Sequence, residues 1–213
     1  MRQFRQVIWD WNGTLFDDAW LCVEIINRLL VKRGLPEVNA EQYQREFTFP
    51  VADYYRKVGF DLEREPFAQL SVEFIEQYDR LRFQCNLQPG VREVLAALTT
   101  RGCRHSILSA TEQSRLDAMI SFNRLQEHFA AVVGISDCYA NGKIDQGKRF
   151  ISEMHCATSE VVLIGDTLHD YEVATAMGIA CILIPSGHCS RARMACSGTR
   201  ILDSVSDLVE GAA

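Results

Sequence analysis

Short runs of consecutive apolar residues recur along the chain, and they restrict its fold more than any other feature. The runs occupy residues 7–9, 105–108, 131–133, 161–164 and 181–184. Such continuous runs are typical of parallel strands that are covered on both faces. Segments with helical spacing separate them, at residues 91–100, 113–122, 147–155 and 170–177. The alternation predicts an α/β fold with a doubly wound parallel sheet.

The alternation is interrupted between the first two expected strands. About 70 residues, from 18 to 87, contain no comparable apolar run. Helical spacing appears instead at residues 20–32 and 67–81, and the Gly-Leu-Pro step at 34–36 breaks the pattern between them. We therefore predict an inserted α-helical cap subdomain at residues 18–87, with an α/β core domain formed by residues 1–17 and 88–213.

Charge, hydropathy and cysteine content narrow the classes of partner. The formal net charge is -6 and the basic side chains are scattered, so no nucleic acid partner is expected. No apolar run approaches the length that spans a membrane, so no membrane partner is expected either. The eight cysteines stand at positions 22, 85, 103, 138, 156, 181, 189 and 196. They form no C-x-x-C pair, which predicts reduced thiols, most of them buried, in a cytoplasmic protein.

The first expected strand delivers an acid at its carboxyl end. Residues 7–15 read VIWDWNGTL, so Asp10 directly follows the strand and a glycine turn follows shortly after. Open α/β sheets bind ligands at the carboxyl ends of their strands. A carboxylate there can attack phosphorus or hold a divalent cation. Taken alone, the segment favours a simple turn, because Asp, Asn and Gly are common after strands.

A second strand repeats the pattern. Residues 161–170 read VVLIGDTLHD, which places Asp166 at the carboxyl end of the strand and Asp170 four residues later, at the start of a helix. This spacing lets both carboxylates point to one side. Oxygen ligands from two strand ends suit Mg²⁺. Because two strands each end in an aspartate, a chance arrangement becomes a poor explanation for these acids.

Ser109 and Lys143 are weaker candidates. Ser109 ends the second expected strand, where its hydroxyl and the following amide can meet a phosphate oxygen, although such a serine more often caps a helix. The Asn-Gly pair at 141–142 predicts a turn that sets Lys143 just ahead of a helix, within reach of a bound phosphoryl group. A lysine beside a turn is more often solvated, so neither residue identifies a site alone.

Together, these four segments resemble the haloacid dehalogenase superfamily, in particular its phosphoglycolate phosphatase-like branch with a helical cap. The motifs are D-x-x-G-T-L, an apolar strand ending in Ser, an isolated Lys and G-D-x-x-x-D. The resemblance covers essentially the whole chain. It implies a Rossmann-like core, a Mg²⁺ cofactor and a small-molecule phosphate ester as substrate, handled by a monomer or homodimer.

The resemblance also assigns roles to individual residues. Asp10 becomes the nucleophile that forms an aspartyl-phosphate, and the phosphoryl group is bound by Ser109, Lys143 and the amides near Trp11 and Ala110. Mg²⁺ is held by Asp10, the backbone carbonyl of Asn12, Asp166 and Asp170, the last directly or through a water. Lys143 is favoured over Lys148 because it lies 166 − 143 = 23 residues before Asp166, a separation similar to the family's.

The chain departs from the family at Asn12, where most of these phosphatases resemble one another in having an aspartate that protonates the leaving alcohol. An amide cannot exchange a proton in this way, so the general acid-base role is open. Asp17 and Asp18 are nominees, although both are expected to cap the first cap helix. His169 is another, although a solvated histidine is the more ordinary expectation.

Two functions therefore remain for comparison. The first is hydrolysis of a phosphate monoester through Asp10. The second is a binding or regulatory protein that keeps the phosphate and metal site but turns over little because of Asn12. Dehalogenation and phosphonate cleavage are disfavoured. The cap is expected to set specificity, with Arg45, Tyr54, Tyr55, Arg56 and Lys57 as candidate contacts for an anionic or sugar substrate, or else as an ordinary exposed face.

Overall fold

A six-stranded sheet forms the centre of the molecule, which is a computed structural model that describes residues 4–135 and 141–210. The strands are β1 (Gln6–Trp9), β4 (Arg104–Glu112), β5 (Phe129–Ile135), β6 (Val161–Gly165), β7 (Ala180–Leu183) and β8 (Arg200–Ile201). Their order is β5-β4-β1-β6-β7-β8, and every neighbouring pair is parallel. The predicted α/β class with a parallel sheet is confirmed, and β8 is a short edge strand that the apolar pattern does not reveal.

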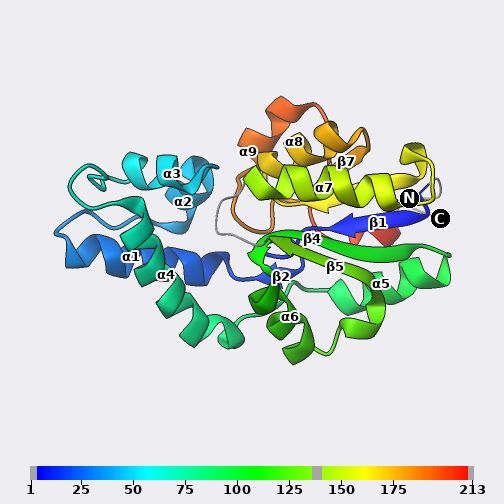
Figure 1. Cartoon of the computed structure of the whole chain (residues 1–213), viewed down its shortest axis with the longest axis horizontal. Helices are drawn as coiled ribbons and strands as arrows, with labels where there is room; N and C mark the ends of the chain where they lie inside the picture. The colour runs from blue at the N-terminus through cyan, green and yellow to red at the C-terminus, as the bar shows by residue number, and fades with distance from the viewer. Residues whose placement is uncertain (1–3, 136–140, 211–213) are drawn as a thin grey trace.

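Helices cover both faces of the sheet (Figure 1). One face carries α5 (Val91–Thr100), α6 (Gln113–Phe122) and α10 (Asp207–Glu210), and the other carries α7 (Asn141–Glu153) and α8 (Leu168–Met177), with α9 (Arg191–Met194) beyond. Alternate side chains of β1 pack into different layers: Val7 and Trp9 join the core that contains α5 and α6, and Ile8 joins the core that contains α8. This two-sided burial explains why the strands read as continuous apolar runs.

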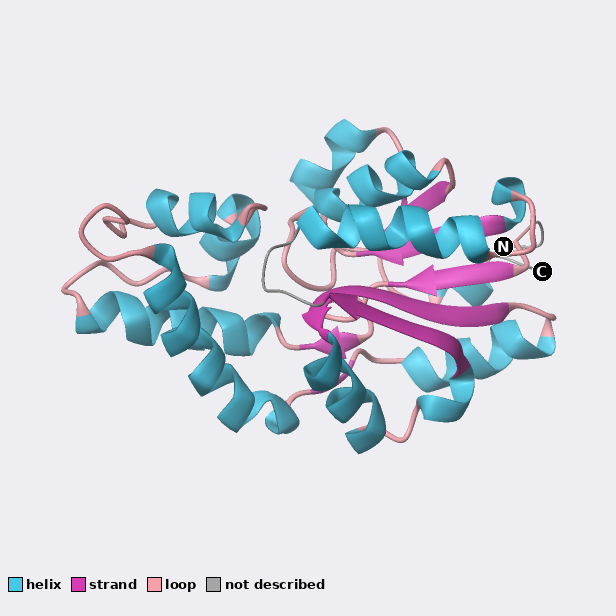
Figure 2. Cartoon of the chain, in the orientation of Figure 1, coloured by secondary structure: helices cyan, strands magenta, loops and turns pink. Residues whose placement is uncertain are grey.

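The segment between β1 and β4 is helical apart from one short strand pair (Figure 2). It contains α1 (Ala19–Lys32), α2 (Ala40–Glu46), α3 (Val51–Lys57) and α4 (Phe67–Leu81). The antiparallel strands β2 (Phe16–Asp17) and β3 (Asn86–Leu87) pair where the chain leaves and re-enters the core. We call residues 18–87 the cap; its boundaries as a separate subdomain stay a prediction.

The arrangement places the cap over one edge of the sheet. The arrowhead of β1 points toward the cap helices in Figure 1, so the carboxyl ends of the strands face the cap. The first cap helix, α1, buries its apolar face, with Leu21, Ile25 and Leu29 fully covered, in the same core cluster as Trp9 and Trp11. The edge that binds ligands in open α/β sheets is therefore covered by the cap helices, whose apolar faces are buried.

Helix α7 differs from the expectation. It begins at Asn141, so the Asn-Gly pair lies in its first turn rather than in a turn ahead of it, and Lys143 is helical. Only the later part of α7 carries the apolar spacing that predicts a helix, which explains the late start of the predicted segment. The short helices α2 and α3 have too few turns for a clear periodic signal.

The cysteines agree with the expected reduced state wherever they are described. Cys22, Cys85, Cys103, Cys181 and Cys189 are free and buried, Cys156 is half-buried and Cys196 is exposed. Cys138 lies outside the described residues. Among the helices that the structure describes, none combines the length and apolar character needed to cross a membrane.

Candidate active site

The predicted site residues meet at the carboxyl edge of three neighbouring strands. Asp10 follows β1, Ser109 lies in β4 and Asp166 follows β6. Because Trp9 pairs with Ile107 on one side and Ile164 on the other, these positions lie at nearly the same height in the sheet. They line a cavity of about 380 Å³ that also includes residues of the cap. The sheet thus brings together residues that are up to 156 positions apart, 166 − 10, in the sequence.

Lys143 joins two of the acids. Its ammonium lies 2.5 Å from Asp10 Oδ1 and 2.6 Å from Asp170 Oδ1, and all three side chains are buried. The two carboxylates raise the pKa of Lys143 although burial opposes this, so the side chain stays charged. Lys148, one helical turn and a half further along α7, is exposed. The structure therefore brings Lys143, and not Lys148, to the predicted site.

Asp170 is fully engaged by the protein. One oxygen accepts from Lys143, and the other accepts from the Thr167 amide at 3.0 Å and the Thr167 hydroxyl at 2.7 Å. The latter pair caps α8 at its first turn. Burial alone would raise the pKa of Asp170, but Lys143 lowers it below the ordinary value. Asp170 is thus an ionised carboxylate that holds Lys143 in place.

Asp166 is held by backbone and hydroxyl groups. Its oxygens accept from the His188 amide at 2.5 Å and the Thr14 hydroxyl at 3.2 Å, and the same hydroxyl lies 3.3 Å from Asp10 Oδ2. Gly13 adopts a φ of +72°, and a Cβ there would overlap the Asp166 carboxylate. The glycine of the first motif is therefore required for both its conformation and its lack of a side chain.

The donor set fits a divalent metal ion. Oxygens of Asp10, Asp166 and Asp170 lie within 4.8 Å of one another. Burial raises the pKa of Asp10 to about 6 and that of Asp166 to about 8, although Lys143 lowers the first and His188 the second. Three buried carboxylates around one lysine are short of positive charge, which a hard cation such as Mg²⁺ would supply. These carboxylates are the groups that would hold such an ion, Asp10 and Asp166 directly and Asp170 directly or through a water.

Asn12 lies between the site and a buried polar network. Its Nδ2 donates to Asp18 Oδ2 at 2.6 Å and to the Tyr78 hydroxyl at 2.8 Å, and its Oδ1 accepts from the Thr111 hydroxyl at 2.5 Å. The amide is thus oriented by protein groups on both ends. A carboxylate at this position would face Asp18 instead of donating to it.

Asp18 does not cap α1 as expected. It occupies the N-cap position without a side-chain capping bond, and it is 1% exposed. Its carboxylate accepts from the Tyr78 hydroxyl at 2.7 Å and the Gly13 amide at 2.9 Å, as well as from Asn12. Burial opposes the charged form, but hydrogen bonds from His188, Tyr78 and Asn12 lower the pKa of Asp18. Asp17, by contrast, belongs to β2.

His188 is a site residue that the motifs do not reveal. Its Nε2 lies 3.4 Å from Asp18 Oδ1 and its Nδ1 lies 2.9 Å from the Tyr43 hydroxyl. Burial lowers the pKa of His188, but Asp18 and then Asp166 outweigh this and raise it to about 9. The residue lies five positions after the end of β7, so the argument that selects Asp10 and Asp166, each directly after a strand, does not select it.

The remaining predicted residues differ in their surroundings. Ser109 is 1% exposed and its Oγ accepts from the Thr111 amide at 3.1 Å; the cap of α6 is Glu112, so Ser109 is not a helix cap. Ala110 lines the cavity, whereas the Trp11 ring is buried against Phe16. Trp11 contributes its amide, which lowers the pKa of Asp10.

His169 contradicts the expectation of a solvated side chain. It is 7% exposed and lines the cavity, with its ring 4.7 Å from that of Phe49. Its Nδ1 lies 3.1 Å from Glu172 Oε2. The sequence pattern places this residue at the start of a helix but gives no sign of the cap residue that covers it.

The candidate substrate contacts of the cap fall into two groups, buried tyrosines and exposed basic residues. Tyr54 and Tyr55 are buried and line the cavity. Arg45, Arg56 and Lys57 are exposed and lie outside its lining. Arg45 pairs with Glu46, and Arg56 pairs with Asp53 at 2.7 Å. These three basic residues therefore agree with the alternative of an ordinary exposed face, whereas the two tyrosines line the cavity.

Fold and site define a member of a known enzyme family. The haloacid dehalogenase-like hydrolase family model matches residues 7–184, which include Asp10, Ser109, Lys143 and Asp166. The chain belongs to this family, as the motifs predict. A haloacid dehalogenase-like hydrolase from Bacteroides fragilis has the same fold, with a TM-score of 0.84 at 17% identity over 97% of this chain and 100% of the other.

Two relatives indicate the range within the family. A phosphoglycolate phosphatase from Synechococcus elongatus is 24% identical, over 97% of this chain and 96% of its own length. The tyrosine-protein kinase PtkA of Mycobacterium tuberculosis is 24% identical over 85% of this chain. The matched region covers 62% of the length of PtkA. The first relative agrees with the predicted phosphoglycolate phosphatase-like branch.

Proposed function

We propose that the chain is a Mg²⁺-dependent phosphatase that hydrolyses a small-molecule phosphate monoester through an aspartyl-phosphate on Asp10. The observation that carries the proposal is the buried cluster of Asp10, Lys143, Asp166 and Asp170 at the inner end of a cavity. Membership of a hydrolase family and similarity to a phosphoglycolate phosphatase support the reaction class. A cytoplasmic location and a monomeric or dimeric state belong to the same proposal.

The chemistry follows from the roles that the contacts permit. An oxygen of Asp10 forms a bond to phosphorus while the ester P–O bond breaks, and the departing alkoxide takes up a proton. Water then attacks the acyl phosphate, which releases orthophosphate and restores the Asp10 carboxylate. Lys143 offsets the charge of the phosphoryl oxygens and Ser109 donates to one of them. Mg²⁺ bound by Asp10, Asp166 and the Asn12 carbonyl would supply further positive charge.

The second candidate is phosphate binding with little turnover. Asn12 favours it, because an amide does not act as a general acid or base near neutral pH and its polar atoms bond to Asp18, Tyr78 and Thr111. Loss of a general acid typically lowers the rate by about 10² to 10⁴. The nucleophile and the phosphate site are unaffected by this loss, so a slowly hydrolysed phosphoenzyme is the form that this candidate takes.

The test is hydrolysis of a panel of phosphate monoesters by the purified protein, with Mg²⁺ and with a chelator. Asp10→Asn serves as the control for contaminating phosphatase, and circular dichroism checks its fold. We expect Mg²⁺-dependent release of phosphate that is absent in the variant. A fully active, folded Asp10→Asn protein would overturn the mechanism. Phosphorylation of the wild type seen by mass spectrometry, without release of phosphate, would favour the second candidate.

A further inference from the structure

The cavity is charged at the core and apolar at the cap. The acids and Lys143 line its inner end, at the edge of the sheet. The cap supplies mainly hydrocarbon and aromatic surface, from Ile26, Phe47, Phe49, Phe67, Phe74 and Ile75, together with buried tyrosines. A phosphoryl group bound at Asp10 therefore leaves its alcohol portion against an aromatic wall.

The lysine and arginine of the lining are already neutralised. Lys143 is paired with Asp10 and Asp170, and Arg115 lies 3.0 Å from Asp79 Oδ1 and 3.6 Å from Glu112 Oε2. The lining histidines also face acids: His188 faces Asp18, and His169 faces Glu172. Among the described residues of the lining, the cap half has no cation left to receive a second anionic group of a substrate.

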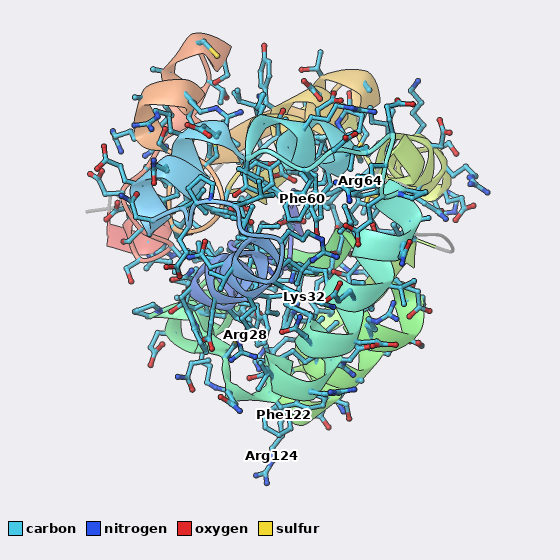
Figure 3. All side chains as sticks on the ribbon, turned by 90° about the vertical axis from the view of Figure 1, so that its left-hand side faces the viewer. Arg28, Lys32, Phe60, Arg64, Phe122 and Arg124 are labelled. Carbon is cyan, nitrogen blue, oxygen red and sulfur yellow. The ribbon has the colours of Figure 1, made fainter. Side chains whose placement is uncertain are left out.

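Several other cations of the cap lie on its outer surface. Figure 3 looks onto the cap end and shows Arg28, Lys32 and Arg64 on that outer surface. Arg28 pairs with Glu24, and Lys32 lies 2.7 Å from Glu73 Oε1. None of the three lines the cavity. The cap thus separates a basic exterior, matched by acids, from an apolar interior.

Three buried polar atoms of the lining remain without partners. The Tyr54 hydroxyl, the Ser71 hydroxyl and His169 Nε2 are buried with no hydrogen bond in the described structure, and all three side chains belong to the lining. Buried polar atoms in native proteins are usually paired. A ligand with an uncharged hydroxyl, carbonyl or ring nitrogen would supply partners that a pure hydrocarbon does not.

We infer that the substrate of this site is the phosphate ester of an uncharged aromatic alcohol, rather than of a small carboxylated alcohol such as glycolate. The inference rests on the proposed function and names its substrate class. The volume permits it, since an apolar cavity of about 150 Å³ holds benzene and this cavity measures about 380 Å³. Aromatic rings gain from edge and offset contacts with the cap side chains. A carboxylate on the alcohol portion of the substrate would be buried against the cap without a counter-charge.

The sharpest test compares benzyl phosphate with 4-carboxybenzyl phosphate. Both release a benzylic alcohol, so their chemical reactivity is closely matched and they differ mainly by one charge. We expect kcat/KM to favour benzyl phosphate by roughly 10- to 100-fold, and to favour it over phosphoglycolate as well. Equal or higher values for either carboxylated ester would overturn the inference while leaving the proposed hydrolysis intact.

A binding measurement keeps the inference testable if no ester is hydrolysed. Benzylphosphonate and 4-carboxybenzylphosphonate are stable analogues whose Kd values calorimetry can measure in the presence of Mg²⁺. Tighter binding of the analogue without the carboxylate, by roughly tenfold or more, would support the substrate class even if the proposed function failed. Preference for the carboxylated analogue, or binding of neither, would refute it.

Two variants on one helix locate the effect in the cavity. Phe74 lines the cavity on α4, whereas Val72 on the same helix is 59% exposed and lies outside the lining. Phe74→Arg should shift the ratio of the two benzyl esters toward the carboxylated one by at least about tenfold. Val72→Arg should leave the ratio unchanged. If Phe74→Arg does not fold, Ser71→Lys makes the same change from a smaller lining residue; unchanged ratios in a folded variant would contradict the inference.

Discussion

The two halves of the cavity differ in chemical character, because the core half buries charged groups and the cap half buries mainly apolar side chains. The core half and the first residue of the cap together bury four acids, Asp10, Asp18, Asp166 and Asp170, which are balanced by Lys143, His188 and backbone amides. The cap half buries aromatic rings and leaves charged groups outside. The comparison indicates that different parts of the chain determine reactivity and selectivity. In the proposed function, the core polarises the phosphoryl group of the substrate, and the cap recognises the uncharged remainder of the substrate by its shape.

The largest effect is expected from removing the cation of the core half. Lys143→Met leaves Asp10 and Asp170 without the charge that lies 2.5 and 2.6 Å from them. Loss of a charge-stabilising donor costs about 10²- to 10³-fold in kcat, and breaking a buried ion pair costs about 3–5 kcal/mol of folding free energy. Steady-state kinetics and urea denaturation, each with and without Mg²⁺, measure the two losses.

Lys148→Met is the matched control, because Lys148 lies on the same helix with its side chain exposed. It should change kcat less than about twofold and stability less than about 0.5 kcal/mol. If the two variants behave alike, Lys143 has no special place in the site, and the ionic account of the core half is wrong.

The second prediction exchanges the acid and the amide that meet at 2.6 Å, Asp18 Oδ2 and Asn12 Nδ2. Asn12→Asp alone sets two carboxylates against each other, so it should lose about 2 kcal/mol of stability or more. The double variant Asn12→Asp/Asp18→Asn restores one acid and one amide. If a missing general acid limits the rate, its kcat should exceed that of the wild type by about 10². No gain in a stable double variant would mean that another group already protonates the leaving alcohol.

The core half and the cap half of the cavity also differ in how much of each could be predicted from the sequence. Asp10 and Asp166 were predictable because each directly follows a buried strand, and parallel strands place their carboxyl ends at one edge. The network of Asp18, Tyr78 and His188 was not, because it joins three distant segments whose contact depends on how the cap lies on the core.

The cap was predictable as helices but not as a binding surface. The apolar spacing of residues 20–32 and 67–81 corresponds to α1 and α4. The same spacing does not say which apolar side chains pack inside the cap and which line the cavity, because both positions select hydrocarbon. For a related reason the sequence left two interpretations open for the basic residues at 45, 56 and 57: charge on a short helix marks an exposed face as readily as a ligand contact.

A third prediction concerns His105, a buried histidine near the amino edge of the sheet, opposite the acids of the carboxyl edge. His105, near the start of β4, is 2% exposed; its Nδ1 accepts from Trp9 Nε1 at 3.0 Å and its Nε2 lies 3.2 Å from the Thr99 hydroxyl. Burial lowers the pKa of His105 from 6.5 to about 4. The neutral form therefore stabilises the fold fully above pH 6.5, and this contribution is lost as the pH falls from 6.5 toward 4.

The expected loss is on the order of 2 kcal/mol across that window. His105→Gln keeps an acceptor for Trp9 but has no proton to bind. The difference in unfolding free energy between wild type and variant, measured by urea denaturation at pH 7.0 and pH 4.5, isolates this histidine from the carboxylates. A difference that does not change with pH would show that His105 titrates alike in the folded and unfolded states.

The smallest expected effect separates two buried tyrosines of the cap whose rings meet edge to face with centroids 5.4 Å apart. The Tyr43 hydroxyl bonds to His188 Nδ1 at 2.9 Å and thus connects the cap to the core half, whereas the Tyr54 hydroxyl has no partner in the described structure. Tyr43→Phe should cost about 1–3 kcal/mol of unfolding free energy, because it leaves His188 Nδ1 buried and unpaired. Tyr54→Phe should cost nothing, or stabilise by up to about 1 kcal/mol. Equal losses by urea denaturation would mean that both hydroxyls are bonded in solution, and the free polar groups that we assign to a ligand would then be occupied by the protein or by water.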